Sequence, residues 1–273
     1  MFKDIVQTLS PRYGAGEARA LAFIILEDAF GVSRLDIYTD KVRNFSEEEE
    51  LRLANILQRL QDGEPLQYII GTALFCGMTF KVTPATLIPR PETEELVEWA
   101  GYDIEGNILD AGTGSGCIAI SMAMHNPKAH VTAWDISTEA LKVAQQNAID
   151  NNVSVTFEER DMLNYLPTAS SIDMIISNPP YICEKEKTDM EQHVLEHEPA
   201  TALFVPDDDP LRFYKALAKL GKHALKPGGI ILMEINSAYG PETLALFQNE
   251  EFSNAELRRD DYGNNRMIKA IKK

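Results

Sequence analysis

The segment NILDAGTGSG (residues 107–116) decides the fold class of this chain. Its first residues are apolar and typical of a buried strand, its last five form a glycine-rich turn, and residues 117–120 continue as a helix. Glycines in such a turn let the backbone change direction sharply and approach a bound ligand closely. The order of strand, glycine turn and helix therefore predicts an α/β fold with a ligand site at the carboxyl ends of its strands.

Strand-like runs alternate with helical segments from residue 92 onward. The runs are NILDAG (107–112), HVTAWDIS (130–137), VTFEERDML (155–163), IDMIISNPP (172–180) and GGIILMEIN (228–236). Such alternation predicts βαβ units, with a mostly parallel sheet covered by helices on both faces. The tail, residues 255–273, has two strand-like runs around Gly-Asn-Asn, which predicts an antiparallel hairpin at the sheet edge.

The N-terminal part has a different pattern. Residues 1–62 carry apolar side chains at helical spacing, and the sequence from Ser46 to Glu49 forms a capping box that opens an amphipathic helix ended by Gly63. Residues 66–82 are rich in β-branched and aromatic side chains and predict a β-hairpin. We expect three parts: a helical domain over residues 1–65 for substrate recognition, a hairpin linker over 66–85 and an α/β domain over 86–273.

The charge of the chain bears on its partners. The 26 lysine and arginine residues are outnumbered by 42 aspartate and glutamate residues, so the formal net charge is 26 − 42 = −16. Affinity for nucleic acid comes largely from basic side chains that displace counterions from phosphates. No direct binding of nucleic acid is therefore expected.

Cysteine usage and the N-terminus indicate the compartment. The cysteines Cys76, Cys117 and Cys183 lie far apart without CxxC spacing, so neither a disulfide framework nor a cysteine-based zinc site is expected. The longest apolar run near the N-terminus, residues 21–26, is too short for a signal peptide or a membrane helix. The sequence HVLEH (193–197) lacks the zincin order, so no metal is expected. These features favour a cytoplasmic protein without a membrane partner.

A carboxylate follows the glycine turn at the spacing of a nucleoside-binding site. Asp135 ends the next strand-like run, 19 residues after Gly116, where it can accept hydrogen bonds from both ribose hydroxyls. Dinucleotide-binding folds share this acid, but the spacing here is GxGxG rather than GxGxxG, and the loop lacks the P-loop lysine. The preceding acid, Asp110, this loop and the terminal hairpin together resemble class I S-adenosylmethionine methyltransferases.

That resemblance implies a Rossmann-like domain with a seven-stranded sheet and S-adenosyl-L-methionine as cofactor. In the family pattern the glycine loop packs against the methionine and ribose portions, Asp135 binds the ribose, and the Asp161-Met162 pair flanks the adenine. Met162 can cover a ring face with its polarisable thioether, or simply fill core space. The implied cofactor-binding residues are Gly112, Thr113, Gly114, Ser115, Gly116, Asp135, Asp161, Met162 and Asn178.

The sequence Asn178-Pro179-Pro180-Tyr181 ends the fourth strand-like run and predicts the acceptor site. Two successive prolines cannot continue a central strand, so the backbone leaves the sheet in a fixed direction. The Asn178 side-chain oxygen and the Pro179 carbonyl can each accept one N–H of a planar amide or aryl amine, and Tyr181 can pack on its flat face. These four residues are the expected catalytic residues, which act by aligning the nitrogen rather than as a strong base.

Three further segments narrow the choice of acceptor. They are GEPLQYIIG (63–71), LIPRPETEELV (87–97) and LEHEPATALF (195–204). With the NPPY sequence they closely resemble the bacterial release-factor glutamine N5-methyltransferases of the PrmC/HemK type, over nearly the whole chain. The resemblance implies methylation of the glutamine side-chain amide in the GGQ motif of peptide-chain release factors, and hence a role in translation termination.

Two departures from that family pattern stand out. The stretch from Val205 to Pro210 carries three aspartates where a glycine-rich segment is usual, which leaves the contacts with a release factor open. Asn236 stands where the family often has glycine after Glu-x. Because asparagine tolerates the left-handed backbone better than most residues, we expect Asn236 to replace glycine in a turn.

Other functions remain open at this point. The NPPY sequence also occurs in enzymes that methylate ribosomal-protein glutamine or the amino groups of adenine N6 and guanine N2. A binding module that holds a translation factor without catalysis is a further alternative. The negative charge argues against nucleic acid, the Arg90 to Thr93 stretch favours the release-factor branch, and the intact Asn178, Tyr181 and Asp135 argue against a non-catalytic module.

Overall fold

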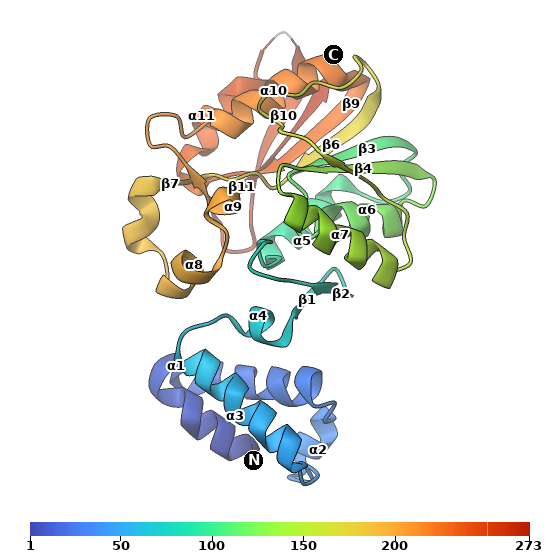
Figure 1. The fold of residues 1–273 in the computed structure, drawn as a ribbon. Coiled ribbons are helices and arrows are strands. Elements are labelled where there is room, and N and C mark those ends of the chain that lie inside the picture. Colours follow the sequence, from blue (N-terminus) through green and yellow to red (C-terminus); the bar gives the residue numbers. More distant parts are fainter. Residues whose placement is uncertain (250) are drawn as a thin grey trace. The chain divides into compact units, whose positions relative to one another are not determined.

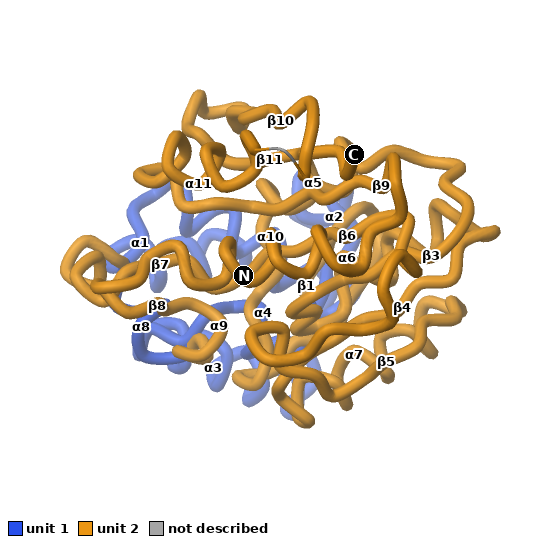
Figure 2. Tube along the Cα trace, turned by 90° about the horizontal axis from the view of Figure 1, so that it is seen from above, with its two compact units in different colours: residues 1–72, 191–197 blue, residues 73–190, 198–273 orange. Residues whose placement is uncertain are grey.

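A computed structural model describes residues 1–249 and 251–273 of the protein. The chain forms two compact units, shown in different colours in Figure 2. Unit 1 contains residues 1–72 and 191–197, and unit 2 contains residues 73–190 and 198–273. The domain boundaries expected at residues 65 and 85 stay predictions.

Unit 1 is built from helices (Figure 1). They are α1 (Phe2–Ile24), the π-helical η1 (Ile25–Ala29), α2 (Arg34–Tyr38), α3 (Glu47–Gln61), α4 (Leu66–Ile70) and α8 (Gln192–His197). The capping box of α3 is confirmed: the Ser46 hydroxyl accepts from the Glu49 N–H, and the Glu49 carboxylate accepts from the Ser46 N–H. The apolar side chains at helical spacing form the core of this unit, which includes Leu9, Ala22 and Leu60.

Residues 66–70 correct the expectation of a hairpin that begins at residue 66. They form helix α4, which begins after Pro65 and ends at Gly71, where φ is +81°. Tyr68 is buried on this helix. Packing of the apolar side chains therefore outweighs the β-propensity of the run, as it often does in short segments.

The hairpin itself is shorter than expected. Strands β1 (Thr72–Phe75) and β2 (Met78–Lys81) form a two-stranded sheet. The two residues between them, Cys76 and Gly77, have φ values of +48° and +73°. Positive φ at both central residues is what a two-residue type I′ turn requires.

Unit 2 contains a seven-stranded sheet with the strand order β10-β11-β9-β6-β3-β4-β5. Its strands are β3 (Gly106–Ala111), β4 (Ala129–Asp135), β5 (Thr156–Glu159), β6 (Ile172–Ser177), β9 (Leu225–Glu234), β10 (Phe252–Arg259) and β11 (Asn265–Lys272). The strands from β5 to β9 in this order are parallel, and the terminal hairpin pairs with β9 in antiparallel. The expected α/β class, the seven strands and the edge hairpin are confirmed.

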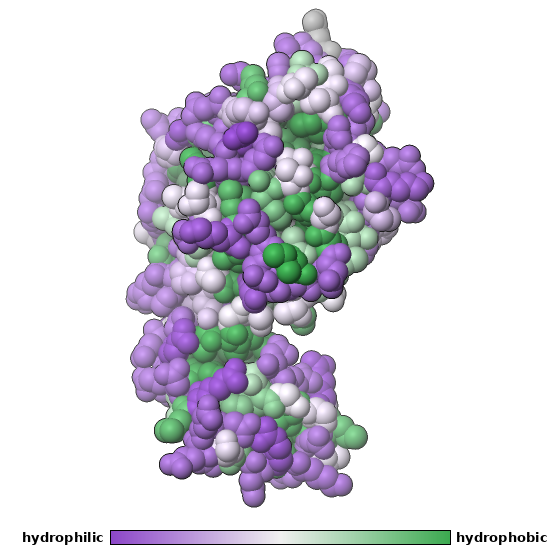
Figure 3. Space-filling view, turned by 45° about the vertical axis from the view of Figure 1, so that its right-hand side comes forward, coloured by the Kyte–Doolittle hydropathy of each residue, from purple (hydrophilic) through white to green (hydrophobic). Residues whose placement is uncertain are grey.

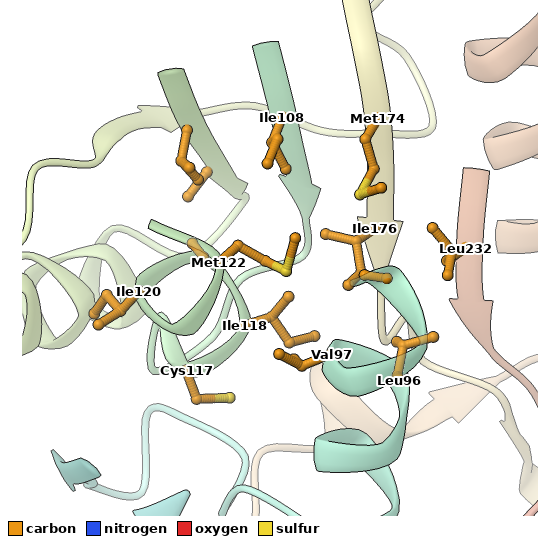
Figure 4. Close-up of a cluster of buried hydrophobic side chains, with 14 of the residues drawn as sticks. Leu96, Val97, Ile108, Cys117, Ile118, Ile120, Met122, Met174, Ile176 and Leu232 are labelled. Carbon is orange, nitrogen blue, oxygen red and sulfur yellow. The ribbon is translucent and has the colours of Figure 1, made fainter. Parts of the chain in front are cut away.

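Helices cover both faces of this sheet (Figure 1). One face carries α5 (Pro91–Ala100), α6 (Cys117–His125) and α7 (Thr138–Asp150), and the other carries α10 (Arg212–Ala224) and α11 (Gly240–Phe247). Successive strand side chains alternate between two buried clusters. Figure 4 shows the first cluster, in which Ile108, Ile176 and Leu232 of the sheet point towards Leu96 and Ile118 of the covering helices.

The connection after β6 carries short elements only. Strand β7 (Ile182–Cys183) pairs in parallel with β8 (Phe204–Val205). The other elements of unit 2 are the 3₁₀-helices η2 (Glu184–Asp189) and η3 (Ser237–Tyr239) and helix α9 (Ala200–Leu203). Pairing of β7 with β8 holds the chain that leaves the NPPY sequence beside residues 204–205.

On the face seen in Figure 3, hydrophilic side chains predominate, and hydrophobic ones lie in smaller groups between them. Within residues 1–249 and 251–273, no helix has the length and apolar character needed to cross a membrane.

Candidate active site

The glycine turn joins β3 to α6 and is shaped by two close approaches. Gly112 and Gly116 both have a φ of +83°. A Cβ atom on Gly112 would lie 2.9 Å from Cε of Met162. A Cβ atom on Gly116 would lie 3.0 Å from Cβ of Ala144 on α7. Gly112 therefore brings the turn against Met162, whereas Gly116 lets α6 pack closely on α7.

Four neighbouring parallel strands of unit 2 end at a cavity of about 440 Å³. Its volume falls within the range of roughly 300–1,000 Å³ that is typical of small-molecule sites. The sequence-predicted residues that line it are Gly112, Thr113, Gly114, Ser115, Asp135, Asp161, Met162, Asn178 and Pro180. Among the described residues, three other predicted ones do not line it, namely Gly116, Pro179 and Tyr181. The cavity thus collects residues from the ends of β3, β4, β5 and β6.

Asp135 lies at the end of β4, between the glycine turn and the start of α7. Its Oδ2 accepts a hydrogen bond from the Gly114 N–H, and its Oδ1 accepts one from the Ser137 N–H, each at 2.8 Å. Burial raises the pKa of this carboxyl, and the backbone hydrogen bonds oppose that shift. Each carboxylate oxygen has a second lone pair, so Asp135 can accept further hydrogen bonds from groups in the cavity.

The residues after β5 border the cavity next to Asp135. Oδ1 of Asp161 accepts from the Leu163 N–H at 2.9 Å, and Oδ2 accepts from the Asn164 side-chain amide at 2.6 Å. These bonds fix the turn that presents Met162 to the cavity. Met162 also packs against the buried cluster beneath α10, so it both fills core space and borders the cavity.

Asn178 follows β6 directly, and its side chain is held from one end only. Its Nδ2 donates to Oγ1 of Thr93 on α5, at 3.0 Å. Within the part of the chain that the structure describes, no group donates a hydrogen bond to Oδ1 of Asn178. Because Asn178 lines the cavity, this oxygen can accept a donor from a bound molecule.

Tyr181 is engaged with a buried carboxylate. Its hydroxyl donates to Oε1 of Glu234 at 2.8 Å. Burial, and then the neighbouring Glu234, raise the pKa of Tyr181 well above its ordinary value. The packing of Tyr181 on an acceptor stays a prediction, and the structure adds a second role for its hydroxyl, as a donor to Glu234.

The chain is similar to known methyltransferases in fold and in sequence. A methyltransferase from Pyrococcus furiosus has a TM-score of 0.53 with this chain, covers 83% of it and 98% of its own chain, and is 16% identical. At that identity the likeness shows the fold alone, which is that of a methyltransferase. Two family models also match: "Methyltransferase small domain" over residues 92–203 and "PrmC N-terminal domain" over residues 2–71.

Curated relatives match over nearly the whole chain. A release factor glutamine methyltransferase of Bacteroides thetaiotaomicron is 45% identical and covers 97% of this chain and 97% of its own. One from Flavobacterium psychrophilum is 42% identical and covers 97% and 96%. One from Streptococcus pneumoniae is 40% identical and covers 82% of this chain and 80% of its own.

The chain belongs to the release factor glutamine methyltransferase family. As a member of this family it is an S-adenosylmethionine-dependent methyltransferase, and the expected enzyme class and cofactor are confirmed. The Rossmann-like fold expected from the sequence agrees with that membership.

The cavity residues fit the cofactor of the release factor glutamine methyltransferase family. Asp135 offers unused acceptor capacity to ribose hydroxyls. The space where a Cβ of Gly114 would stand is open to 4 Å, so the backbone itself can face a ligand. Met162 offers a polarisable side chain for a ring. Within residues 1–249 and 251–273, no group of three or more His, Cys, Asp or Glu side chains could hold a metal.

Two of the segments that carry the family resemblance, 87–97 and 195–204, contribute residues that pair beside this cavity. The guanidinium of Arg90, which lines the cavity, pairs with the Glu198 carboxylate at 2.5 Å. The side chain of Glu198 is fully buried and also accepts from the Ile88 N–H at 3.4 Å. This ion pair joins the segment before α5 to the segment before α9.

Sequence reasoning missed two residues of the site, Thr93 and Glu234. Both are buried, with 3% and 1% of their surface exposed, and the Thr93 hydroxyl donates to Oε2 of Glu234 at 2.7 Å. A signal was present, because Glu234 is a carboxylate within the otherwise apolar run GGIILMEIN (228–236). Buried carboxylates need hydrogen-bonding partners, so the run itself predicts a polar network at the end of β9.

Asn236 corrects the expectation of a left-handed turn. Its φ is −66° and its ψ is 125°, which is extended backbone. Its Oδ1 accepts from the Ala238 N–H at 2.9 Å, and its Nδ2 donates to the Tyr181 carbonyl at 3.0 Å. This position therefore uses the side-chain amide, which ties the NPPY sequence to the end of β9, and needs no left-handed backbone.

Asp110, the acid before the glycine turn, is fully buried. Its Oδ2 accepts from Oγ1 of Thr113 at 2.6 Å and from the Ala119 N–H at 3.2 Å. Its Oδ1 has no hydrogen-bond partner among the residues that the structure describes. Burial raises the pKa of Asp110 to about 7, and the two hydrogen bonds oppose that shift.

Asp110→Asn is expected to change how stability depends on pH. Because the pKa of Asp110 is higher in the folded chain than in the unfolded chain, its contribution to stability is full below about pH 4 and is lost as the pH rises through about 7. Asparagine cannot ionise. The variant is therefore expected to gain stability relative to wild type by up to about 1.4 kcal/mol per pH unit across that window.

Urea unfolding followed by tryptophan fluorescence measures this effect, since Trp99 and Trp134 both lie in unit 2. Wild type and variant are compared at several pH values, so that the titrations of other groups cancel. A stability difference that stays constant across the window would contradict the raised pKa of Asp110.

Proposed function

We propose that the protein methylates N5 of the glutamine side chain in the GGQ motif of peptide-chain release factors. The observation that carries this proposal is the state of Asn178, which lines the cavity and whose Nδ2 donates to Thr93, while its Oδ1 is an unused acceptor among the described residues. An amide NH₂ group is the donor that such an oxygen can orient. The names of the curated relatives support the release factor as the source of that amide.

The proposed cofactor-binding residues divide the cavity between them. Asp135 would accept the ribose hydroxyls, the turn from Gly112 to Gly116 would contact the methionine and ribose portions, and Asp161 and Met162 would lie beside the adenine. When bound, S-adenosylmethionine supplies an electrophilic methyl group on a sulfonium.

The acceptor amide would be held by Asn178 and the Pro179 carbonyl. Its nitrogen lone pair is delocalised, so alignment of the nitrogen and stabilisation of the positive charge that develops on it supply most of the rate enhancement. The hydrogen bonds to both oxygens strengthen as that charge grows, because the N–H groups become better donors. No strong base is needed, because the proton can leave the nitrogen after transfer.

We also propose that the helical N-terminal part, residues 1–65, recognises the substrate, and that residues 66–85 link it to the methyltransferase domain at 86–273. The match of residues 2–71 to a family-specific N-terminal model supports this division. The net charge of −16 supports a protein partner rather than nucleic acid, so no direct binding of nucleic acid is proposed. Methylation of ribosomal-protein glutamine is the second candidate, since it needs the same amide geometry.

A transfer assay separates these functions. Purified protein is incubated with labelled S-adenosylmethionine and separate pools of release factor, ribosomal protein, RNA and DNA. Label is expected on release factor. Label on ribosomal protein or nucleic acid instead would replace the proposed substrate, and the absence of label from release factor would contradict the proposed function.

A further inference from the structure

A chain of hydrogen bonds runs from the cavity to a buried carboxylate at the end of β9. Asn178 donates to Thr93 at 3.0 Å, and Thr93 donates to Glu234 at 2.7 Å. Glu234 also accepts from the Tyr181 hydroxyl at 2.8 Å. The chain thus connects β6, the N-terminal turn of α5 and β9, and the other oxygen of Glu234 reaches the last residue of the NPPY sequence.

The protons available along these hydrogen bonds explain why the Asn178 side-chain amide has one orientation. A threonine hydroxyl has one proton to donate and otherwise accepts. The Thr93 proton is directed to the carboxylate of Glu234, so Thr93 can only accept on the side of Asn178. Only the NH₂ end of Asn178 can satisfy that acceptor. The carbonyl end is thereby left as an acceptor without a donor among the described residues, and Asn178 lines the cavity, where an amide NH₂ group would need an acceptor.

We propose that Thr93, held by Glu234, is a positioning residue that fixes the side-chain amide of Asn178 with its oxygen towards the acceptor nitrogen. This inference rests on the proposed amide methylation and deepens it. Rotation of the Asn178 amide by half a turn would place its NH₂ group against the substrate NH₂ group. Two donors would then face each other, and the nitrogen would lose the partner that aligns it.

The protonation state of Glu234 determines which groups donate and which accept in these hydrogen bonds. As a carboxylate it accepts from both Thr93 and Tyr181. Once protonated it can donate to Thr93, which frees the Thr93 proton to point at Asn178 and favours the reversed amide. Burial raises the pKa of Glu234, and its hydrogen bonds from Thr93 and Tyr181 lower it. The deprotonated, productive form is therefore lost as the pH falls through that raised pKa.

Other groups around Glu234 act on the same equilibrium. Arg266 on β11 lowers the pKa of Glu234, and Glu92 on α5 raises it. Burial raises the pKa of Tyr214 on α10, and the nearby charge of Glu234 raises it further. The Tyr214 hydroxyl accepts a hydrogen bond from the Asn236 N–H at 2.8 Å. Tyr181 is the neighbour whose hydroxyl can be removed with its ring retained.

Thr93→Val and Thr93→Ser form a matched pair of variants. Valine keeps the shape of threonine but leaves Nδ2 of Asn178 without an acceptor, whereas serine keeps the hydroxyl. With release factor as substrate, Thr93→Val is expected to lower kcat by about 10- to 100-fold, and Thr93→Ser is expected to stay within about threefold of wild type. The Kd of S-adenosylmethionine and the melting temperature are measured for each variant, so that loss of the cofactor site or of the fold is recognised.

The pH profile of kcat gives a readout that a merely structural role would not move. Wild type is expected to lose activity at acid pH as Glu234 is protonated. Thr93→Val is expected to lack that acid limb, because without the Thr93 hydroxyl no hydrogen bond connects the protonation of Glu234 to the orientation of Asn178. Tyr181→Phe removes a donor to the carboxylate, so it is expected to shift the acid limb to higher pH. This variant also serves if Thr93→Val does not fold.

Two results would overturn the inference while leaving the proposed function intact. One is an active wild type whose kcat is unchanged in a folded Thr93→Val variant. The other is an acid limb at the same pH in wild type and Tyr181→Phe. By contrast, a wild type that transfers no methyl group to release factor would overturn the proposed function itself, and with it the inference.

Discussion

Asn178→Ala is expected to lower kcat by about 100- to 1,000-fold, the loss seen when one preorganised hydrogen-bonding group is removed from a transition-state site. The variant keeps the glycine turn and Asp135, which lie on other strands. The affinity for S-adenosylmethionine is therefore expected to stay within about threefold of wild type, because the lost contact is made mainly to the acceptor. Single-turnover transfer to release factor measures the rate, and calorimetry measures the affinity.

The melting temperature of Asn178→Ala serves as the control for folding. Removal of the side chain also leaves the Thr93 hydroxyl with one partner fewer. A folded variant that binds cofactor and turns over at the wild-type rate would show that the proposed amide clamp is wrong.

Asp135→Ala is expected to weaken the affinity for S-adenosylmethionine more than it lowers kcat. A hydrogen bond to a charged group is worth about 1.5–3 kcal/mol, so loss of even one ribose contact is expected to weaken the affinity for S-adenosylmethionine by at least about 10-fold. The Gly114 and Ser137 N–H groups also lose their acceptor, which loosens the turn. At saturating cofactor, kcat is expected to fall much less than in Asn178→Ala.

Asp135→Asn is the matched control for that variant. It keeps the size of the side chain but replaces one acceptor oxygen with a donor, so its affinity is expected to lie between those of wild type and Asp135→Ala. Equal cofactor affinity in wild type and Asp135→Ala would exclude the ribose-binding role of this carboxylate.

The α/β part of the fold followed from the sequence because its signals are local. Apolar runs that end in a glycine turn, in Asp135 or in Asn178 mark the carboxyl ends of strands, and parallel strands place those ends at one edge. The structure brings these positions together at one cavity. The terminal hairpin was likewise predictable from two runs around a short polar turn.

Features that depend on tertiary packing could not be predicted from local sequence patterns. Residues 66–70 have the composition of a strand but form helix α4, with Leu66 and Tyr68 buried. Asparagine can adopt the left-handed backbone that glycine favours, but Asn236 has extended backbone and instead forms two hydrogen bonds with its side-chain amide. The hydrogen bonds from Asn178 to Thr93 and from Thr93 to Glu234 join residues that are 85 and 141 positions apart in the sequence. No local sequence pattern predicts contacts over such separations.

The position of the added methyl group decides whether the protein methylates the GGQ glutamine of a release factor. Release factor is incubated with the protein and S-adenosylmethionine, digested, and examined by tandem mass spectrometry. One added methyl group is expected, located on the side-chain amide of the glutamine in the GGQ motif. A methyl group on another residue of the release factor, or an unmodified glutamine after complete incubation with active protein, would contradict it.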